Sequence, residues 1–184
     1  AKPHKLTRHD FEKSTAWIKQ QLDIATSRRD VSDPLLTFLG SLFERVVVFL
    51  VRGQALQGFQ AALPAQHQEE SEHVRELVLS LDNDSSFAKV VSSHSSFLGP
   101  LNQNSEDRRF LRYLGEDEPP QTAFIAPLIL GGRVVQLFYM DRGAGKNVPR
   151  NLGDITIALS QAATVYERII GSKVKEYTEP PESK

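Results

Sequence analysis

The sequence TAFIAPLILGGRVVQLFYMD, residues 122–141, contains the clearest structural signal in the chain. Two apolar runs flank Gly131 and Gly132, and glycine tolerates the positive φ angles that a tight hairpin turn requires. In each run, the residues that would point to either face of a strand are apolar, which indicates a sheet covered on both faces. This stretch therefore predicts a buried β-hairpin.

A second hairpin is predicted in ERVVVFLVRGQALQGFQAAL, residues 44–63. The β-branched run at residues 46–51 favours a strand, and Arg52 and Gly53 form a turn before a second, alternating run. ELVLSL, residues 76–81, is predicted as a third strand, which the polar sequence DND closes. These segments indicate an antiparallel sheet.

Helices are predicted before, between and after the strands along the sequence, where apolar residues recur at helical spacing. Asp10 and Asn151 are predicted N-caps, and Pro34 is predicted in the first turn of the second helix. The serine-rich stretch SSHSSFLGPLNQNS is predicted as a loop. The predicted helices end near Thr26, Phe43, Ser93, Leu114 and Val174.

Together these elements predict an α+β fold. The predicted architecture is an antiparallel sheet of about five to six strands covered by helices, with the N- and C-terminal helices packed together.

The order of these elements resembles that of GAF domains. AFIAPLILGGRVVQLFYMDRG, residues 123–143, looks like the closing hairpin of the family, where a strand with a proline, a glycine turn and a strand ending in an aspartate recur. Residues 44–63 resemble the opening hairpin, and residues 152–170 resemble the Ala-rich last helix. The resemblance spans about residues 35–172. It implies a small-molecule sensor, or an interaction and dimerisation module, in a bacterial-type signalling protein, often attached to output domains.

The chain departs from the ligand-binding members of that family. Bilin-binding members need a cysteine, and this chain has none. The Asn-Lys-Phe-Asp-Glu signature of cyclic-nucleotide-binding members is not recognisable. Gln136 stands where the family's last strand often has glycine, and its larger side chain occupies space that a ligand would use. No functional residue of the family transfers to this chain one for one.

Composition narrows the classes of function. The 184 residues are 40% hydrophobic and 24% charged with a formal net charge of −1, as expected for one soluble domain. Charge is evenly spread, so no segment has the basic excess that nucleic-acid binding needs. The longest apolar run, residues 46–51, is far shorter than the roughly 20 residues that span a bilayer. A cytoplasmic protein with no nucleic-acid or membrane partner is expected.

Three segments are predicted from these patterns. Residues 1–9 are predicted to be a flexible N-terminal segment and residues 175–184 a flexible acidic tail, because both are polar and contain proline. Residues 10–174 are predicted to form a single GAF-like domain.

Candidate reactive groups are few. His67, Glu70 and His73 share helical spacing, but a solvated acidic loop is the better interpretation than a metal site. His94 lies among serines without a nucleophile elbow. The GAGK sequence ending at Lys146 lacks both the first glycine and the Ser or Thr of a phosphate loop. We therefore expect no catalytic residue, no metal, no cofactor and no enzyme activity.

Aromatic side chains gather in the segments that would close over the sheet. These side chains could line a pocket for a planar ligand, or they could fill the same space as core. The bulk of Gln136 and the lack of convergent charges favour core. The candidate ligand-binding residues are Phe87, Phe97, Phe110, Phe124, Gln136 and Phe138.

The last predicted helix has apolar residues at alternating spacings of three and four. Such a stripe can pack on its own sheet, or it can extend the surface of a helical-bundle dimer. The first predicted helix adds Trp17 and Ile18, which favours the dimer. The candidate homodimer interface comprises Trp17, Ile18, Leu159, Ala162, Tyr166 and Ile169.

Two functions remain after these exclusions. The preferred hypothesis is a non-catalytic GAF-like regulatory domain in signal transduction, which dimerises and docks a protein partner or an attached output domain. The alternative is a small-molecule sensor that binds its ligand between the sheet and residues 85–115.

Overall fold

Six strands form one antiparallel sheet in the computed structural model, which describes residues 8–101, 104–115 and 119–178. The order across the sheet is β3-β2-β1-β6-β5-β4, so β1 and β6 join the two predicted hairpins at its centre. In this central pair Arg45 lies opposite Asp141, and Leu50 lies opposite Gln136. The strands are β1 (Arg45–Arg52), β2 (Ala55–Ala62), β3 (Val78–Ser80), β4 (Phe97–Gly99), β5 (Ala123–Leu130) and β6 (Arg133–Asp141).

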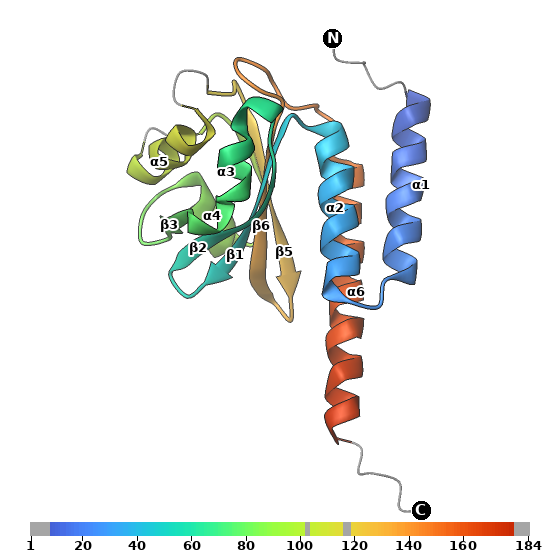
Figure 1. Ribbon diagram of the computed structural model, residues 1–184. Coiled ribbons are helices and arrows are strands. Elements are labelled where there is room, and N and C mark those ends of the chain that lie inside the picture. The colour runs from blue at the N-terminus through green and yellow to red at the C-terminus, as the bar shows by residue number, and fades with distance from the viewer. Residues whose placement is uncertain (1–7, 102–103, 116–118, 179–184) are drawn as a thin grey trace, which may run out of the picture.

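Helices cover both faces of this sheet (Figure 1). On one side α1 (Arg8–Ile24), α2 (Arg28–Leu42) and α6 (Gly153–Thr178) form a layer in which each helix contacts the other two. On the other side lie α4 (Ser86–Ser93) and α5 (Ser105–Leu114). The short α3 (Gln68–Glu72) contacts β2. The predicted α+β architecture, with terminal helices packed together, is confirmed.

The glycine turn predicted between β5 and β6 is present. Gly131 and Gly132 have φ angles of 54° and 74°, which side chains rarely adopt. Past the turn, the register between β5 and β6 shifts once, between Leu128 and Ile129. The shift adds twist to this hairpin and interrupts the alternation on β6: Val135 packs under α1, α2 and α6, whereas Leu137 lies under α4 and α5.

The predicted start of the second helix is wrong by six residues. Its N-cap is Ser27, whose hydroxyl oxygen accepts a hydrogen bond from the backbone N–H of Asp30 at 3.2 Å. The Asp30 carboxylate accepts in return from the N–H of Ser27 at 2.9 Å. This reciprocal capping box fixes the first turn, and Pro34 lies inside the helix.

Other boundaries differ less. α1 begins at Arg8, before the predicted cap Asp10, and α6 ends four residues beyond Val174. The predicted loop between α4 and α5 contains β4, which pairs with the first residues of β5. Within the described residues, no helix combines the length and apolarity that a membrane span requires.

The sheet separates two cores. The core under α1, α2 and α6 is largely aliphatic and takes side chains from alternate positions of each central strand, such as Val46 and Val48 of β1. The core under α4 and α5 takes the other positions, such as Val47 and Phe49. A strand residue therefore belongs to one core or the other, which decides where each predicted site residue lies.

Candidate functional site

Aromatic rings fill the space between the sheet and helices α4 and α5. Phe49 comes from β1, Phe87 from α4, Phe110 from α5 and Tyr139 from β6, and all four are fully buried. The ring centroids of Phe110 and Tyr139 are 4.5 Å apart, and those of Phe87 and Phe110 are 5.0 Å apart, both edge to face. We call these four residues the aromatic cluster. The cluster occupies the predicted ligand space.

Buried hydrogen bonds fix the two helices that carry half of this cluster. Asp107 of α5 is fully buried, and its carboxylate accepts from the backbone N–H of Ser86 at 3.1 Å and from the Ser86 hydroxyl at 2.7 Å. The side chains of Ser85 and Asn104 cap the N-termini of α4 and α5. Since Asp107 joins one helix to the other, α4 and α5 are held together over the sheet.

The six candidate ligand-binding residues do not lie together. Phe87, Phe97 and Phe110 belong to the core under α4 and α5. Phe124 and Phe138 belong to the core under α1, α2 and α6, and Gln136 lies on the same face, where Tyr166 of α6 is near. The six residues therefore do not line one space in this structure, because alternate strand residues point to opposite faces of a sheet.

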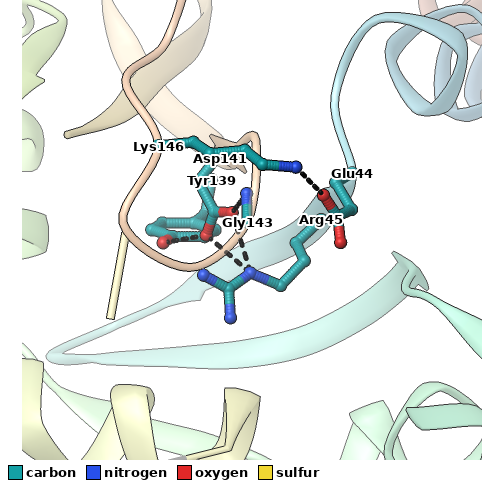
Figure 2. A network of polar contacts seen from close by, with 6 residues as sticks. All are labelled: Glu44, Arg45, Tyr139, Asp141, Gly143 and Lys146. Carbon is teal, nitrogen blue, oxygen red and sulfur yellow. Dashed lines mark hydrogen bonds and ion pairs between the residues drawn. The ribbon is translucent and has the colours of Figure 1, made fainter. Parts of the chain in front are cut away.

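A buried polar network joins β1, β6 and the loop that follows β6 (Figure 2). The Arg45 guanidinium donates from Nε to both carboxylate oxygens of Asp141, at 2.7 and 3.0 Å. The Tyr139 hydroxyl and the Gly143 backbone N–H also donate to this carboxylate. Asp141 is fully buried, so its charge is compensated within the protein and is not accessible to a substrate.

The same network explains why Tyr139 stays protonated and why position 143 is a glycine. Burial, and then the negative charge of Asp141, raise the pKa of Tyr139 well above its usual value, so the hydroxyl keeps its proton and donates. Gly143 has φ +98°, and a Cβ there would lie 2.5 Å from Glu44 Oε2. Glu44 also lies 3.5 Å from Lys146 Nζ, so the lysine of the GAGK sequence is engaged in an ion pair. Sequence reasoning missed Arg45, although a charged residue that begins an apolar strand was a usable signal.

Five of the six candidate dimer residues are buried within one chain. Ile18 of α1, and Leu159, Ala162, Tyr166 and Ile169 of α6, all lie in the core under the three-helix layer. The predicted stripe on α6 therefore packs against its own sheet and helices, and homodimerisation stays a prediction. Trp17 is 38% exposed and is not part of that core.

Two of the described histidines have close polar neighbours within the chain. His67 Nδ1 lies 3.4 Å from Glu70 Oε1, and His73 Nδ1 lies 2.9 Å from the backbone carbonyl of Glu69. His94 ends α4 in an exposed, left-handed conformation. In the part of the chain that the structure describes, no three His, Asp or Glu side chains are arranged to hold a metal ion.

The fold is similar to that of many solved structures. One is the GAF domain of a phosphoenolpyruvate-protein phosphotransferase from Coxiella burnetii, at 11% identity and a TM-score of 0.65, over 92% of this chain and 98% of that one. A second is residues 122 to 287 of a methyl-accepting chemotaxis protein, at 16% identity and a TM-score of 0.64, over 85% and 98%. A third is a phycoerythrobilin-bound GAF domain from a cyanobacterial phytochrome, at 10% identity and a TM-score of 0.62, over 91% and 100%.

These matches define the class of fold: the chain has the GAF-domain fold, and the resemblance seen in the sequence is confirmed at that level. No protein-family model matches the sequence, and no curated protein matches it. At 10–16% identity the matches show the fold alone, so the function has to be argued from this chain's own residues.

Proposed function

We propose that this chain is a non-catalytic regulatory domain of a signalling protein, acting as a protein-interaction and dimerisation module. The observation that carries the proposal is the aromatic cluster, which fills the space between the sheet and helices α4 and α5. Because packed rings occupy this part of the described structure, regulation by protein contact is favoured over regulation by a ligand that would bind among them. The chemotaxis protein and the phytochrome, which contain domains of the same fold, support a signalling role by analogy.

The residues also support a role without chemistry. The chain has no cysteine, which removes thiol nucleophiles and thiol redox reactions. The buried carboxylates of Asp107 and Asp141 are both used to hold elements of the fold together. A general acid or base must reach its substrate, and neither of these groups is exposed.

The outer surface of the three-helix layer is the proposed contact region. Trp17 and Ile24 of α1 and Ile157 of α6 are large apolar side chains that the chain itself leaves exposed. A two-fold interface would use the same patch on both subunits and bury each of these residues twice. The dimer proposed here thus differs from the sequence-based hypothesis in using the outside of the helices.

Sedimentation equilibrium at micromolar protein concentration tests this proposal. We expect a homodimer that Trp17→Glu shifts toward monomer, because a charge would enter desolvated surface. Leu98→Glu on β4 is the matched control, since Leu98 is 53% exposed on an edge strand and should leave the dimer intact. A single species at 20.6 kDa for the unmodified protein would rule out dimerisation.

The alternative function is a small-molecule sensor with its ligand between the sheet and residues 85–115. The bilin-bound neighbour supports it, because that GAF domain holds a ligand on the same fold. In this chain the aromatic cluster would have to open first. Hydrogen exchange distinguishes the two functions, since a ligand stabilises only the state that binds it. Protection of α4 and α5 by a tetrapyrrole, a cyclic nucleotide or an organic acid would favour the sensor.

A further inference from the structure

A hollow of about 760 Å³ opens on the helical side of the sheet, at the end where β1 turns into β2. The first turns of α2, the β1–β2 hairpin, the 3₁₀ turn Val74–Glu76, β6 and α6 all contribute to its walls. It is within the usual size range of small-molecule sites. It lies on the face of the sheet opposite the aromatic cluster, and we call it the hairpin hollow.

The hairpin hollow is strongly basic. Arg28, Arg29, Arg52 and Arg75 line it, against one carboxylate, Asp33. That carboxylate is already engaged: it accepts from Arg29 Nε at 3.0 Å and from the side-chain amide of Gln60 at 3.1 Å. Among the described residues, Arg28, Arg52 and Arg75 have no carboxylate partner. Three unmatched guanidinium groups thus surround one hollow in a chain of net charge −1.

The helix dipole adds to this positive potential. Arg28 and Arg29 occupy the first turn of α2, where the partial positive charge of the helix N-terminus disfavours cations. The capping box of Ser27 and Asp30 already uses backbone N–H groups of that turn. The guanidinium groups, more than the helix N-terminus, are therefore the available donors for an anion.

Beside the arginines the hollow has an apolar and aromatic wall. The Arg75 guanidinium lies 5.4 Å from the centre of the Phe59 ring, and Leu50 and Val135 lie nearby in the same lining. Gln136 is 9% exposed, and its side-chain oxygen has no hydrogen-bond donor among the described residues. The hollow therefore combines charged donors for an anion, apolar surface and, in Gln136, an acceptor that suits a hydroxyl or N–H group of a ligand and not its phosphate.

We propose that the hairpin hollow binds a small phosphate monoester. Guanidinium groups pair with phosphate oxygens through two parallel hydrogen bonds, and three unmatched positive charges suit a dianion better than a single carboxylate. The apolar part of the ligand packs against Phe59 and Val135. This site lies outside both the proposed dimer surface and the space between the sheet and residues 85–115.

A ligand bound at this site would connect the sheet with helices α2 and α6. The lining includes Arg28 of α2, Arg52 of the hairpin and Tyr166 of α6, so one ligand touches the sheet and both of these helices. A ligand that binds only the folded arrangement stabilises it in proportion to its concentration. The phosphate monoester thereby strengthens the attachment of α6 to the sheet.

Phenyl phosphate, which has an aromatic ring and one phosphate group, is the probe for the first test. Titration of the unmodified chain is followed in ¹H–¹⁵N spectra, with phenol and inorganic phosphate in separate arms. We expect saturable shifts centred on Arg52, Phe59 and the Gln136 side-chain amide, weaker shifts with phosphate and none with phenol. Shifts confined to residues 87–110, or no saturable shift, would overturn the proposal.

Substitution of the arginines gives the second test. Arg52→Ala with Arg75→Ala should lower the affinity for phenyl phosphate by about ten-fold or more, because each removes charge-assisted hydrogen bonds. Arg142→Ala is the control: Arg142 is exposed beyond the other end of β6 and carries the same charge. Equal losses in the control and the double variant would reveal a general charge effect and overturn the site.

A charge-conserving variant and an acidic peptide complete the test of the site. Arg52→Lys retains the charge and loses the paired donors, so it should weaken binding even if the double variant fails to fold. Hexaglutamate tests an acidic protein segment as the occupant. If hexaglutamate shifts these resonances and phenyl phosphate does not, the small-molecule proposal is wrong. None of these outcomes alters the sedimentation result, so this proposal and the proposed function fail separately.

Discussion

The two faces of the sheet bury their polar groups in different ways. Under α4 and α5 the core contains the aromatic cluster, whose rings contact one another, and two fully buried carboxylates, Asp107 and Asp141, hold its helices and strands together. Under α1, α2 and α6 the core mixes aliphatic side chains with dispersed aromatic ones such as Phe38, Phe124 and Phe138, and the carboxylates of Asp30 and Asp33 near the start of α2 are exposed. The first face is closed by internal contacts, whereas the second opens into the hairpin hollow.

This difference indicates where a binding function can reside. A face whose volume is filled by rings has to lose packing before it admits a ligand. A face with exposed arginines and a preformed hollow can bind an anion without that cost.

Phe110→Ala should have the largest effect, because it removes the ring that contacts Phe49, Phe87 and Tyr139. We expect the free energy of unfolding to fall by about 4 kcal/mol, from lost burial and from the cavity left behind. The cavity should also make the variant bind benzene, which an apolar cavity of that kind accepts. Urea unfolding, and a thermal shift on adding benzene, measure the two effects.

Phe59→Ala is the matched control on the other face. Phe59 is half-buried at the hairpin hollow, so its loss should cost about 1–2 kcal/mol and create no benzene site. Equal costs for the two substitutions would mean that the aromatic cluster is no better packed than the open face.

Asp141→Asn should have the next largest effect. The amide keeps an acceptor for the Gly143 N–H but leaves the Arg45 charge buried without its partner. We expect a loss of about 3 kcal/mol, at the low end for breaking a buried ion pair. The double variant Arg45→Met with Asp141→Asn should lose less unfolding free energy than Asp141→Asn alone, since it removes both charges. A double variant that loses the sum of the single effects would show that the two charges are not coupled.

The two central hairpins, β3 and most helices could be predicted because local chemistry specifies them. The glycine pair at Gly131 and Gly132 and the β-branched run of β1 fixed the two hairpins. The start of α2 was misplaced because Pro34 was preferred over the Ser27-to-Asp30 capping box, a signal equally present in the sequence. β4 was missed because its three residues form a strand only by pairing with β5.

The grouping of the candidate site residues depends on long-range packing, which the sequence does not show. Phe138 and Tyr139 are adjacent in sequence and lie in different cores, so aromatic residues grouped by sequence do not form one pocket. The stripe through Leu159 and Tyr166 was correctly identified as apolar, but its partner was assigned wrongly. Sequence periodicity shows that a helix face is buried; it does not show whether α1 and α2 or a second chain covers it.

The smallest expected effect is at the exposed cap of α2, on the open face. Ser27→Ala removes the hydroxyl that caps the helix and should lower the free energy of unfolding by about 1 kcal/mol. The backbone N–H of Thr26, and then the side chain and N–H of Ser27, hold the pKa of Asp30 below its usual 3.8. The pKa of Asp30 is lower in the folded than in the unfolded protein, so the stabilisation from its carboxylate is fully present at pH values above the unfolded pKa. It is lost as the pH falls through the folded value. The substitution should therefore raise the pKa of Asp30 toward 3.8 in an NMR titration of its carboxyl group. A pKa that stays unchanged in the variant would show that the Ser27 hydroxyl does not stabilise the Asp30 carboxylate, and that the cap of the open face rests on backbone donors alone.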